Sequence, residues 1–428
     1  DAAARSAALS ATAPVSDVKE SANGADNASN AEHSDDMPTV PIPARKVVTT
    51  FDAASRHERL EVKPPLTRLF RRTITKAFSV WLKFSTALVR SLDWYPRVEP
   101  YVGYGTEPYS RLICRTVYGP FKRQAGRLIR GIRGMLMVPS PHTKVRIAID
   151  DVPIETVQVG ASEVYDAIDS NPDISSEFAA SDDAGYLDLL AGHSLEPGIH
   201  NVSYKVRSRK PVNANLFTIP SGTKVGVISD VDDTIMVTQA PRLMKAAYNL
   251  LLLNPRKKVP VASMNLLFNR IADMFTDAPF FYLSTSPWNV ESSIRHFITN
   301  HGFPEGPLLL RDLDPRPKTF VPSGVQHKLE YAEQLMADFP DMKFILIGDD
   351  GQKDPTTYAT IAKRYPGRVL AVGIRQLSPR ESAGSLGTMA GLAATQPVPV
   401  TDVPVFTGTT GSNLMKTMMP YLKQQLDK

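Results

Sequence analysis

Two carboxylates that are two positions apart follow a short apolar run in this chain of 428 residues. Asp230 and Asp232 lie in the sequence Asp-Val-Asp-Asp-Thr at residues 230–234, directly after residues 225–229. The preceding run is rich in β-branched side chains and predicts a buried strand, and ligands of open α/β sheets bind beyond the carboxyl ends of such strands. A lone Asp-x-Asp is more often an acidic turn or a helix cap. The partners of the two aspartates therefore decide whether they form a site.

A second predicted strand, residues 343–348, ends in Asp349 and Asp350, and Asp354 follows a few residues later. Acidic strand ends at one edge of a sheet can share a cation. Magnesium prefers oxygen ligands and usually takes one or two carboxylates together with a substrate phosphate. Asp230, Asp349 and Asp350 would supply about that number of carboxylates, so Mg is the expected cofactor.

Three hydroxyl side chains follow a third predicted strand at residues 279–283; they are Ser284, Thr285 and Ser286. A hydroxyl at a strand end can hold a phosphoryl oxygen. Because side chains alternate between the two faces of a strand, a one-residue error in the strand end changes which hydroxyl points inward. All three hydroxyls therefore stay candidates.

Lys328 begins a predicted helical stretch and could supply a positive charge, with Lys318 as its rival and a solvated helix lysine as the ordinary alternative. His327 is expected to be a neighbour rather than a catalyst. Phosphoryl transfer through a covalent intermediate needs a nucleophile, a proton donor, a metal, and a cation or hydroxyl for the equatorial oxygens. The chain carries all of these kinds of group.

This order and spacing resembles the haloacid dehalogenase superfamily of phosphohydrolases, in which an Asp-x-Asp-x-Thr strand end is followed by a Ser or Thr strand end, a Lys, and Gly-Asp-Asp-x-x-x-Asp. The resemblance implies an α/β fold with a Rossmann-like parallel sheet of that type and a small cap. It also implies that Asp230 is the nucleophile that becomes an aspartyl-phosphate. Asp232 would protonate the leaving oxygen and then activate the hydrolytic water.

The same resemblance implies roles for the other motif residues. Ser284 would bind the phosphoryl group, and Lys328 would offset charge on the nucleophile and the phosphate. Asp354 would orient neighbouring groups, and Asp233 needs no catalytic role. The expected metal ligands are Asp230, the main-chain carbonyl of Asp232, Asp349 and Asp350. The expected substrate-binding residues are Thr234, Thr285, Ser286 and Trp288.

Three further details are Ser-Pro-Trp-Asn at residues 286–289, Asp-Asp-Gly-Gln-Lys-Asp-Pro at 349–355, and Pro-Tyr-Val-Gly-Tyr-Gly-Thr at 100–106. They are similar to the actin-patch-type phosphatidate phosphatase family, including its bacterial members. The similarity covers roughly residues 97–376 and implies a β-sandwich-like segment before the catalytic domain. It also implies magnesium-dependent hydrolysis of phosphatidate to diacylglycerol and phosphate.

Only 44 residues separate Thr234 from Pro279, which is room for a flap and two short helices near residues 241–253 and 261–274. A cap of this size cannot enclose a metabolite well, so water exclusion must come from a neighbouring domain or from the surroundings of the substrate. An open site favours a large or surface-bound phosphate ester, such as a phospholipid at an anionic membrane surface.

The basic residues are concentrated in one tract. Residues 63–149 contain seventeen Lys and Arg against three acidic residues, although the whole chain carries a net charge of only +5. Residues 66–92 contain no acid and have helical periodicity, which predicts a basic amphipathic helix of the kind that lies in a membrane interface. Its expected apolar face comprises Leu66, Phe70, Ile74, Ala77, Trp81, Phe84, Leu88 and Leu92. A second basic segment at residues 121–137 could add to the attraction.

Such a helix can instead pack its apolar face on its own domain and expose its charges to water. The cations without interleaved acids argue against this alternative, because a solvated face usually mixes signs. Nucleic acid is the other polyanion to consider. The aromatic residues repeat as a helical stripe rather than as a stacking platform on strands, which favours lipid over nucleic acid.

Composition and pattern divide the chain into five expected regions. They are a disordered tail at 1–62, the basic helix at 63–96, the β-sandwich-like domain at 97–220, the catalytic domain at 221–378, and a C-terminal tail with a short helix at 379–428. No window holds the roughly 18 uninterrupted apolar residues of a membrane span. The lone Cys114 excludes an internal disulfide and fits a reducing compartment. We therefore expect a cytoplasmic protein that associates peripherally with membranes.

Two other classes of function use the same features. A phosphatase that acts on a nucleic-acid end or a phosphoprotein would need the same aspartates and could hold its polymer on the basic tract. A non-catalytic membrane-binding module would need only the amphipathic helix, and the complete set of motifs argues against it.

Overall fold

The computed structural model describes residues 80–81, 83–92, 94–119, 138–140, 143–153, 157–158, 178–180, 185–206, 209–237, 259–311, 324–351, 353–378 and 402–426. Several expectations lie outside these residues. They are the N-terminal tail at 1–62, the second basic segment at 121–137, the first cap helix at 241–253, and Lys318.

Parallel strands form the sheet that carries the predicted motifs. Among the described residues its order is β15-β14-β11-β16-β17-β18, and every neighbouring pair is parallel. The strands are β11 (Val225–Asp230), β14 (Phe280–Pro287), β15 (Leu308–Arg311), β16 (Lys343–Asp349), β17 (Val369–Arg375) and β18 (Val405–Gly408). Strands of parallel sheets are covered on both faces and are therefore continuous apolar runs. The mixed α/β fold with a parallel sheet is confirmed.

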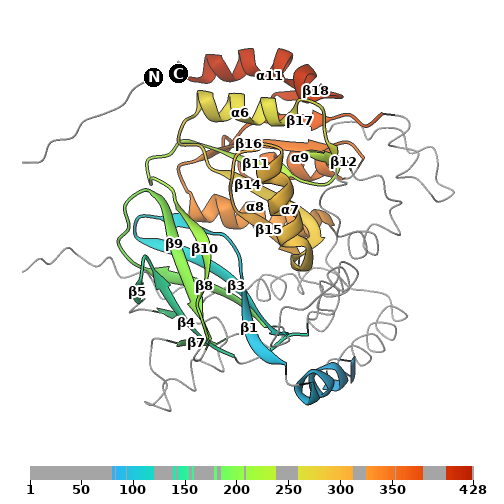
Figure 1. Ribbon diagram of the computed structural model, residues 1–428. Helices are drawn as coiled ribbons and strands as arrows, with labels where there is room; N and C mark the ends of the chain where they lie inside the picture. Colours follow the sequence, from blue (N-terminus) through green and yellow to red (C-terminus); the bar gives the residue numbers. More distant parts are fainter. Residues whose placement is uncertain are drawn as a thin grey trace, which may run out of the picture. The chain divides into compact units, whose positions relative to one another are not determined.

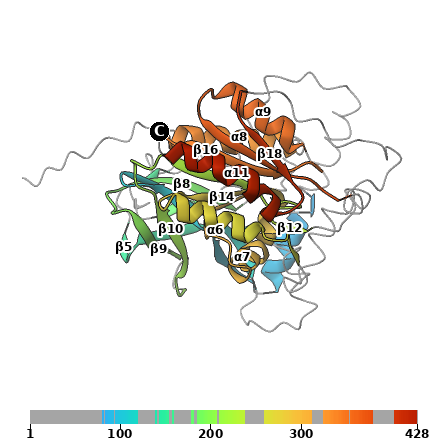
Figure 2. The ribbon, with the colours of Figure 1, turned by 90° about the horizontal axis from the view of Figure 1, so that it is seen from above.

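Helices cover both faces of this sheet (Figure 1). They are α6 (Met264–Met274), α7 (Glu291–Asn300) and α11 (Gly411–Leu426) on one face, and α8 (Gly324–Asp338) and α9 (Asp354–Arg364) on the other. Val227 packs with the first set and the adjacent Ile228 with the second, because successive side chains of a strand point to opposite faces. Figure 2 shows α6 and α11 side by side over the sheet.

The C-terminal segment contributes to this sheet. The helix expected near residues 413–425 is α11, which buries Leu414, Met418 and Leu422 against the sheet. The sequence analysis did not predict the strand before it, β18, which pairs in parallel with β17. A strand of four residues, most of them half-buried or exposed, has little local pattern to identify it. Residues 405–426 therefore complete the sheet and one of its helical layers.

A short hairpin-like pair marks the start and end of the cap. β12 (Met236–Val237) and β13 (Val259–Pro260) are antiparallel and flank the undescribed segment 238–258. The helix expected at residues 261–274 as part of the cap corresponds to α6, but it packs on one face of the parallel sheet. The described part of the insertion therefore stays close to the motif at Asp230–Thr234.

The strands before residue 220 form a second sheet. In the described residues its order is β5-β4-β9-β10-β2-β3-β8-β6, with β1 on β3 and β7 on β4. The strands are β1 (Tyr95–Pro100), β2 (Gly103–Thr106), β3 (Tyr109–Gly119), β4 (Lys144–Ile149), β5 (Val152–Pro153), β6 (Val157–Gln158), β7 (Phe178–Ala180), β8 (Tyr186–Gly192), β9 (Gly198–Lys205) and β10 (Val212–Thr218). All pairs except β10–β2 are antiparallel. Antiparallel β structure is confirmed, but the hydrogen bonds join it as one sheet, so a two-sheet sandwich is not shown.

A buried polar network joins β2 and β3 to α8. The Tyr104 hydroxyl donates to Asp338 Oδ2 at 3.1 Å, and the Tyr109 hydroxyl donates to the Asp338 carbonyl at 2.8 Å. Arg111 Nε lies 3.7 Å from Asp338 Oδ2, and both side chains are almost fully buried. Gln334 Nε2 donates to the Tyr104 hydroxyl at 2.6 Å. The second sheet is therefore tied to α8, the helix that also carries Lys328.

The described part of the predicted basic helix is helical at residues 80–81 and 83–91. Val89 is buried with Tyr118 and Val138, and Arg90 Nε and Nη2 donate to the Tyr118 hydroxyl at 3.2 and 3.1 Å. The other apolar side chains are exposed: Trp81 by 48%, Phe84 by 62%, Leu88 by 47% and Leu92 by 55%. One edge of the apolar face therefore packs on the protein, while most of it faces solvent. Among the described residues, no helix has the length and apolar character needed to span a bilayer.

Candidate active site

The strand register brings the three motif strands to one edge of the parallel sheet. Asp230, the last residue of β11, is level with Leu283 of β14, and Ser229 is level with Ile347 of β16. Ser284 and Asp349 therefore follow at almost the same height as Asp230. All three side chains are buried, with exposed fractions of 1% or less. This edge is the carboxyl end, where α/β sheets bind ligands.

The turn after Asp230 folds back on itself. Asp233 has a φ of 62°, in the left-handed region that non-glycine residues rarely adopt. Its N–H donates to the Met236 carbonyl at 2.8 Å, and the Met236 N–H donates to the Val231 carbonyl at 3.2 Å. Thr234 Oγ1 donates to Asp230 Oδ2 at 3.3 Å, so this predicted substrate-binding residue contacts the predicted nucleophile.

Two of the three candidate hydroxyls point at Asp232. Ser284 Oγ and Ser286 Oγ both donate to Asp232 Oδ2, at 2.9 and 3.0 Å, and the Ser286 N–H donates to Ser284 Oγ at 2.9 Å. Thr285 lies between them and is half-buried, and no hydrogen bond joins it to Asp232 in the described part of the chain. The structure therefore favours Ser284 and Ser286, whose side chains point to the same face of the strand, over Thr285 as the hydroxyls that contact Asp232.

Lys328 reaches the site from the first turn of α8. Its Nζ lies 2.6 Å from Asp230 Oδ1 and also pairs with Asp354 Oδ1. His327, the preceding residue, is buried and bonds to the Ser284 carbonyl through Nε2 at 3.1 Å. Burial, followed by Arg311, lowers the pKa of His327 to about 3, so the ring is neutral and serves as a neighbour of the hydroxyl strand.

Three buried carboxylates form the group best placed to hold a cation. Oxygen atoms of Asp230, Asp349 and Asp354 lie within 4.8 Å of one another. The Asp349 N–H donates to Asp354 Oδ2 at 3.3 Å. Asp350 is not part of this group, and its Oδ1 accepts a hydrogen bond from the Leu377 N–H at 2.8 Å. The geometry therefore favours Asp354 over Asp350 as the third carboxylate, whereas the family resemblance implied only an orienting role for Asp354.

The charges in the cluster shift one another. Burial raises the pKa of Asp230 to about 8, Lys328 opposes the rise, and Asp354 and Asp232 add to it. Burial, followed by Asp354 and Asp230, raises the pKa of Asp349 well above its usual range. Burial alone would lower the pKa of Lys328, but Asp230 and Asp354 raise it, so the lysine is charged. A divalent cation would favour the ionised forms of these carboxyl groups, and their hard oxygen atoms suit an ion such as magnesium.

Trp288 does not lie open to a substrate. It is 1% exposed, and its ring stacks on Tyr101 with centroids 4.4 Å apart. In this structure the Trp288 ring packs on Tyr101, and its role in substrate binding stays a prediction.

Sequence reasoning also missed Arg375, the last residue of β17. It is buried, and its Nη1 donates to the Asp233 carbonyl at 2.7 Å. An arginine that directly follows an uninterrupted apolar strand was the available signal. A charged group there reaches the carboxyl edge of the sheet, where the acidic turns lie.

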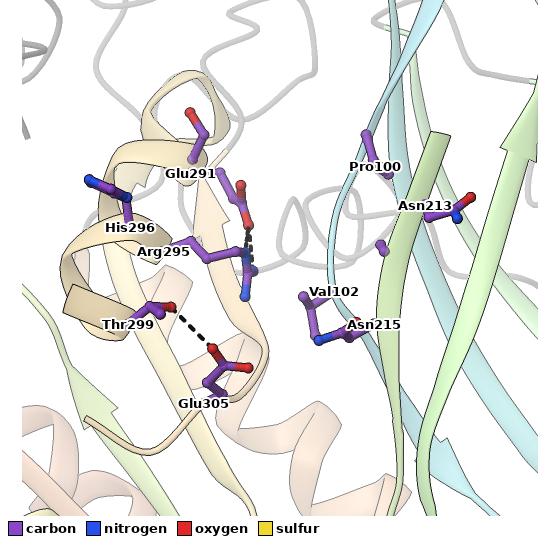
Figure 3. A pocket seen from close by; sticks show the side chains of 11 residues that line it. Pro100, Val102, Asn213, Asn215, Glu291, Arg295, His296, Thr299 and Glu305 are labelled. Carbon is purple, nitrogen blue, oxygen red and sulfur yellow. Dashed lines mark hydrogen bonds and ion pairs between the residues drawn. The ribbon is translucent and has the colours of Figure 1, made fainter. Parts of the chain in front are cut away.

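A polar groove of about 440 Å³ lies elsewhere, between α7 and the segments around β1, β2 and β10 (Figure 3). Glu291 and Arg295 line one wall, where Arg295 Nε donates to Glu291 Oε1 at 2.6 Å, and Asn213 and Asn215 line the other. Among the described residues, none that lines this groove belongs to the acidic cluster. The chemistry therefore belongs to the buried cluster rather than to this groove.

The carboxyl edge of this parallel α/β sheet carries buried carboxylates, a lysine and two serines, which are the kinds of group that proteins use to hold a cation and a phosphoryl group. Residues 225–376 match the family model described as the catalytic domain of phosphatidate phosphatase APP1. This range runs from the start of β11 to just beyond the end of β17 and leaves out β18 and α11.

Two relatives are similar over longer or comparable stretches. Phosphatidate phosphatase APP1 of Saccharomyces cerevisiae is 26% identical over 245 residues, which is 57% of this chain and 40% of that protein. An uncharacterized protein of Schizosaccharomyces pombe is 25% identical over 154 residues, 36% of this chain and 25% of that protein. The matched part of the chain thus spans less than half the length of each relative.

Proposed function

We propose that this protein is a magnesium-dependent phosphatidate phosphatase of the haloacid dehalogenase type, which hydrolyses phosphatidate to diacylglycerol and phosphate. The observation that carries the proposal is the pairing of Asp230 with Lys328 beside an Asp232 that is held by Ser284 and Ser286. This constellation lies inside the segment that matches the phosphatidate phosphatase catalytic domain. The family match supports phosphatidate as the substrate, and the geometry supports the roles proposed for these residues.

In the first step of the proposed reaction, a carboxylate oxygen of Asp230 attacks phosphorus and forms an aspartyl-phosphate. The bond between phosphorus and the glycerol oxygen breaks, and Asp232 gives its proton to that oxygen, which leaves as diacylglycerol. In the second step Asp232 takes a proton from water, which attacks the phosphorus and releases phosphate and free Asp230. Lys328 offsets charge on Asp230 and the phosphoryl oxygens throughout.

Asp230, Asp349 and Asp354 would hold the magnesium ion, because their oxygen atoms already lie within 4.8 Å of one another. When bound, the ion would neutralise charge on the phosphoryl oxygens. It would also favour the ionised form of Asp230, whose pKa is otherwise raised to about 8. The proposed nucleophile therefore depends on both Lys328 and the ion for its charge.

Phosphate release from phosphatidate in detergent micelles tests the proposal directly. The wild type should require magnesium and lose activity with a chelator, and Asp230→Asn should be inactive. Asp277→Asn, in an exposed turn, is the matched control and should keep wild-type activity. Equal activity of the wild type and Asp230→Asn would overturn the nucleophile assignment. Release from a phosphopeptide or a nucleic-acid end, with none from phosphatidate, would assign a polymer substrate instead.

We also propose that the helix at residues 80–91 docks on anionic membranes and brings the site to its substrate. Its exposed stripe of Trp81, Phe84, Leu88 and Leu92 is large and apolar, and Lys83 is exposed on the same helix. Such a stripe gains free energy when it leaves water for the acyl boundary, and cations add about 1 kcal/mol each near anionic lipid. The contact of Arg90 with Tyr118 would hold the stripe in a fixed orientation on the protein.

Vesicle sedimentation separates this role from catalysis. The triple variant Trp81→Ala, Phe84→Ala, Leu88→Ala should lose binding to phosphatidate-containing vesicles while it still hydrolyses a soluble phosphate ester. The matched control replaces three exposed apolar side chains outside the helix, Val152, Ile199 and Leu266, with alanine. Unchanged sedimentation of the helix variant, or equal loss in both triples, would refute the docking role.

A further inference from the structure

Arg375 connects three segments that are far apart in the sequence. It ends β17, is 4% exposed, and lies level with Asp349 of β16. Its Nη1 donates to the Asp233 carbonyl at 2.7 Å, and its Nε donates to the Thr409 carbonyl at 3.4 Å. Its own carbonyl accepts a hydrogen bond from the Asp350 N–H at 3.0 Å. One side chain thus joins the Asp-x-Asp turn to the C-terminal segment, and its backbone joins the second acidic turn.

The turn that Arg375 holds is a strained one. Asp233 sits at a φ of 62°, and a non-glycine residue persists there only where surrounding contacts enforce the conformation. The turn sets the direction of the preceding residue, Asp232, whose carboxylate meets Ser284 and Ser286. A charged donor on a buried carbonyl is among the stronger hydrogen bonds a protein can make.

The C-terminal segment around Gly411 packs closely against the residues that follow β13. The Gly411 N–H donates to the Ala262 carbonyl at 2.9 Å, just after β13. A Cβ at Gly411 would lie 2.0 Å from the Ser263 carbonyl oxygen, so no larger residue fits without movement. Thr409 therefore stands on a segment that is fixed against the base of the cap, and it gives Arg375 a rigid second partner.

We propose that Arg375 is a positioning residue that keeps the Asp233 turn in place, so that Asp232 is aimed at the leaving oxygen. The proposal deepens the proposed function and rests on it for the role of Asp232. It also makes β18 and α11 part of the catalytic unit, although the family match ends at residue 376. In this role Arg375 acts through the turn that its side chain holds.

A second arginine, next to the start of β17, offers a matched control. Arg368, just before β17 at the opposite end of the sheet, also donates to carbonyls, those of Met342 at 2.8 Å, Phe339 at 2.6 Å and Met336 at 3.3 Å. Arg368→Gln therefore removes a comparable set of arginine–carbonyl bonds far from the acidic turns. A merely structural role of Arg375 would make the two glutamine variants behave alike.

Kinetics on a soluble alkyl phosphate, glycerol 3-phosphate, give the first measurement, because its alkoxide leaving group needs a proton from the general acid. Arg375→Gln should lower kcat by about 10- to 100-fold with KM changed less than about twofold, because a displaced general acid costs turnover rather than binding. Arg375→Lys, which keeps a cation and a donor, should recover part of kcat. Arg368→Gln should stay within about twofold of the wild type. Unchanged kcat in Arg375→Gln, or an equal loss in Arg368→Gln, would overturn the proposal.

Amide hydrogen exchange gives a second measurement that does not depend on activity. In Arg375→Gln the amides of residues 233–236 should exchange faster, while those of β16 stay protected; in Arg368→Gln residues 233–236 should not change. If the wild type hydrolyses no phosphate ester, the proposed function fails, and this exchange pattern still decides whether Arg375 holds the turn. Unchanged exchange at residues 233–236 in Arg375→Gln would refute the clamp itself.

Discussion

At the carboxyl edge of the parallel sheet, three buried carboxylates share one lysine, whereas the second sheet meets α8 through one buried carboxylate that has several donors. Asp230 and Asp354 pair with Lys328, and Asp349 lies close to both, so the three carboxyl groups oppose one another's ionisation. Asp338 is matched instead by Arg111 and by two tyrosine hydroxyls, one of them on its carbonyl. The crowded carboxyl groups suit a site that binds a cation, and the matched carboxylate suits a contact that holds two parts of a protein together.

The difference shows that burial of charge does not by itself mark a functional site. Both regions bury ionisable side chains almost completely. In the acidic cluster burial and neighbouring carboxylates raise the pKa of Asp230 and of Asp349, so these groups are held in an environment that opposes their charge. Substitutions in the cluster should therefore change turnover, and substitutions in the network should change stability.

Lys328→Met should have the largest effect. Without the ammonium, the pKa of Asp230 rises further above about 8, and less of the nucleophile is ionised at neutral pH. We expect kcat to fall by about 10²- to 10³-fold, as for other preorganised charged groups in active sites. Steady-state kinetics with a soluble ester and saturating magnesium measure it. Lys343→Met, exposed at the other end of β16, is the control, and a loss of less than twofold in Lys328→Met would contradict the assignment.

Asp338→Ala should lower the stability of the protein, because it removes the carboxylate at the centre of the buried network between the second sheet and α8. It leaves Arg111 buried without its carboxylate, which costs about 3 kcal/mol or more of unfolding free energy. Urea denaturation measures the loss, and kcat per folded molecule should change by less than about twofold. Glu333→Ala, on the same helix, loses an exposed pair with Arg364 and should cost under about 1 kcal/mol. Equal destabilisation by the two variants would show that the buried network contributes no more to stability than the pair of Glu333 with Arg364.

Single alanine variants of Ser284, Thr285 and Ser286 would show which of the three hydroxyl groups contributes to catalysis. Ser284→Ala and Ser286→Ala each remove one hydrogen bond to Asp232 and should each lower kcat by about tenfold, the equivalent of about 1.4 kcal/mol. Thr285→Ala should have the smallest effect of the three, because this residue lies between the two that point at Asp232. A ranking with Thr285 first would mean that the other face of the strand meets the substrate.

Removal of the surface ion pair between Asp150 and His200 should have the smallest effect, a slight change in thermal stability. Hydrogen bonds from the Asn201 N–H and from His200 lower the pKa of Asp150 below 3.8. Burial by itself would lower the pKa of His200, but the hydrogen bond with Asp150 raises it above 6.5. The Asp150 contribution is present above pH 3.8 and is lost as pH falls; the His200 contribution is present below pH 6.5 and is lost as pH rises. Asp150→Asn should therefore lower the melting temperature slightly, and most between these values.

Thermal unfolding from pH 3 to pH 8 measures that window. Asp151→Asn is the matched control, since Asp151 occupies the same turn and also has a positive φ. The Asp150→Asn difference should shrink at both ends of the range. A difference that is the same at every pH would mean that the turn, rather than the charged pair, is responsible.

Much of the site could be predicted because its signals are local. Each motif strand is an apolar run, and each ends in carboxylates or hydroxyls at its last residues. Parallel strands bring their carboxyl ends to one edge, so Asp230, Ser284 and Asp349 were expected together and are found together. Lys328 was expected from the order of motifs, and α8 carries it to Asp230.

Other features of the site depended on packing at a distance. The Trp288 ring is buried and stacks on Tyr101, which lies between β1 and β2. Asp354 approaches Asp230 and Asp349 because α9 begins immediately beside the end of β16, while the side chain of Asp350 turns to the backbone of Leu377. The exposed stripe on the helix at residues 80–91 also required the structure, because periodicity alone fits a packed face and an exposed face equally well.

The sequence by itself determined the three motif strands and the carboxylates and hydroxyls that stand near their carboxyl ends, because strand formation and alternation are properties of a few neighbouring residues. It did not determine every strand or strand end, since β18 was not predicted and β14 continues to Pro287. The tertiary structure alone decided which of these side chains meet. Register between strands selected Ser284 and Ser286 over Thr285, and the return of the chain through β17 and β18 brought Arg375 to the Asp233 turn. Distances of a few ångströms between residues far apart in the chain follow from packing, and no local pattern encodes them.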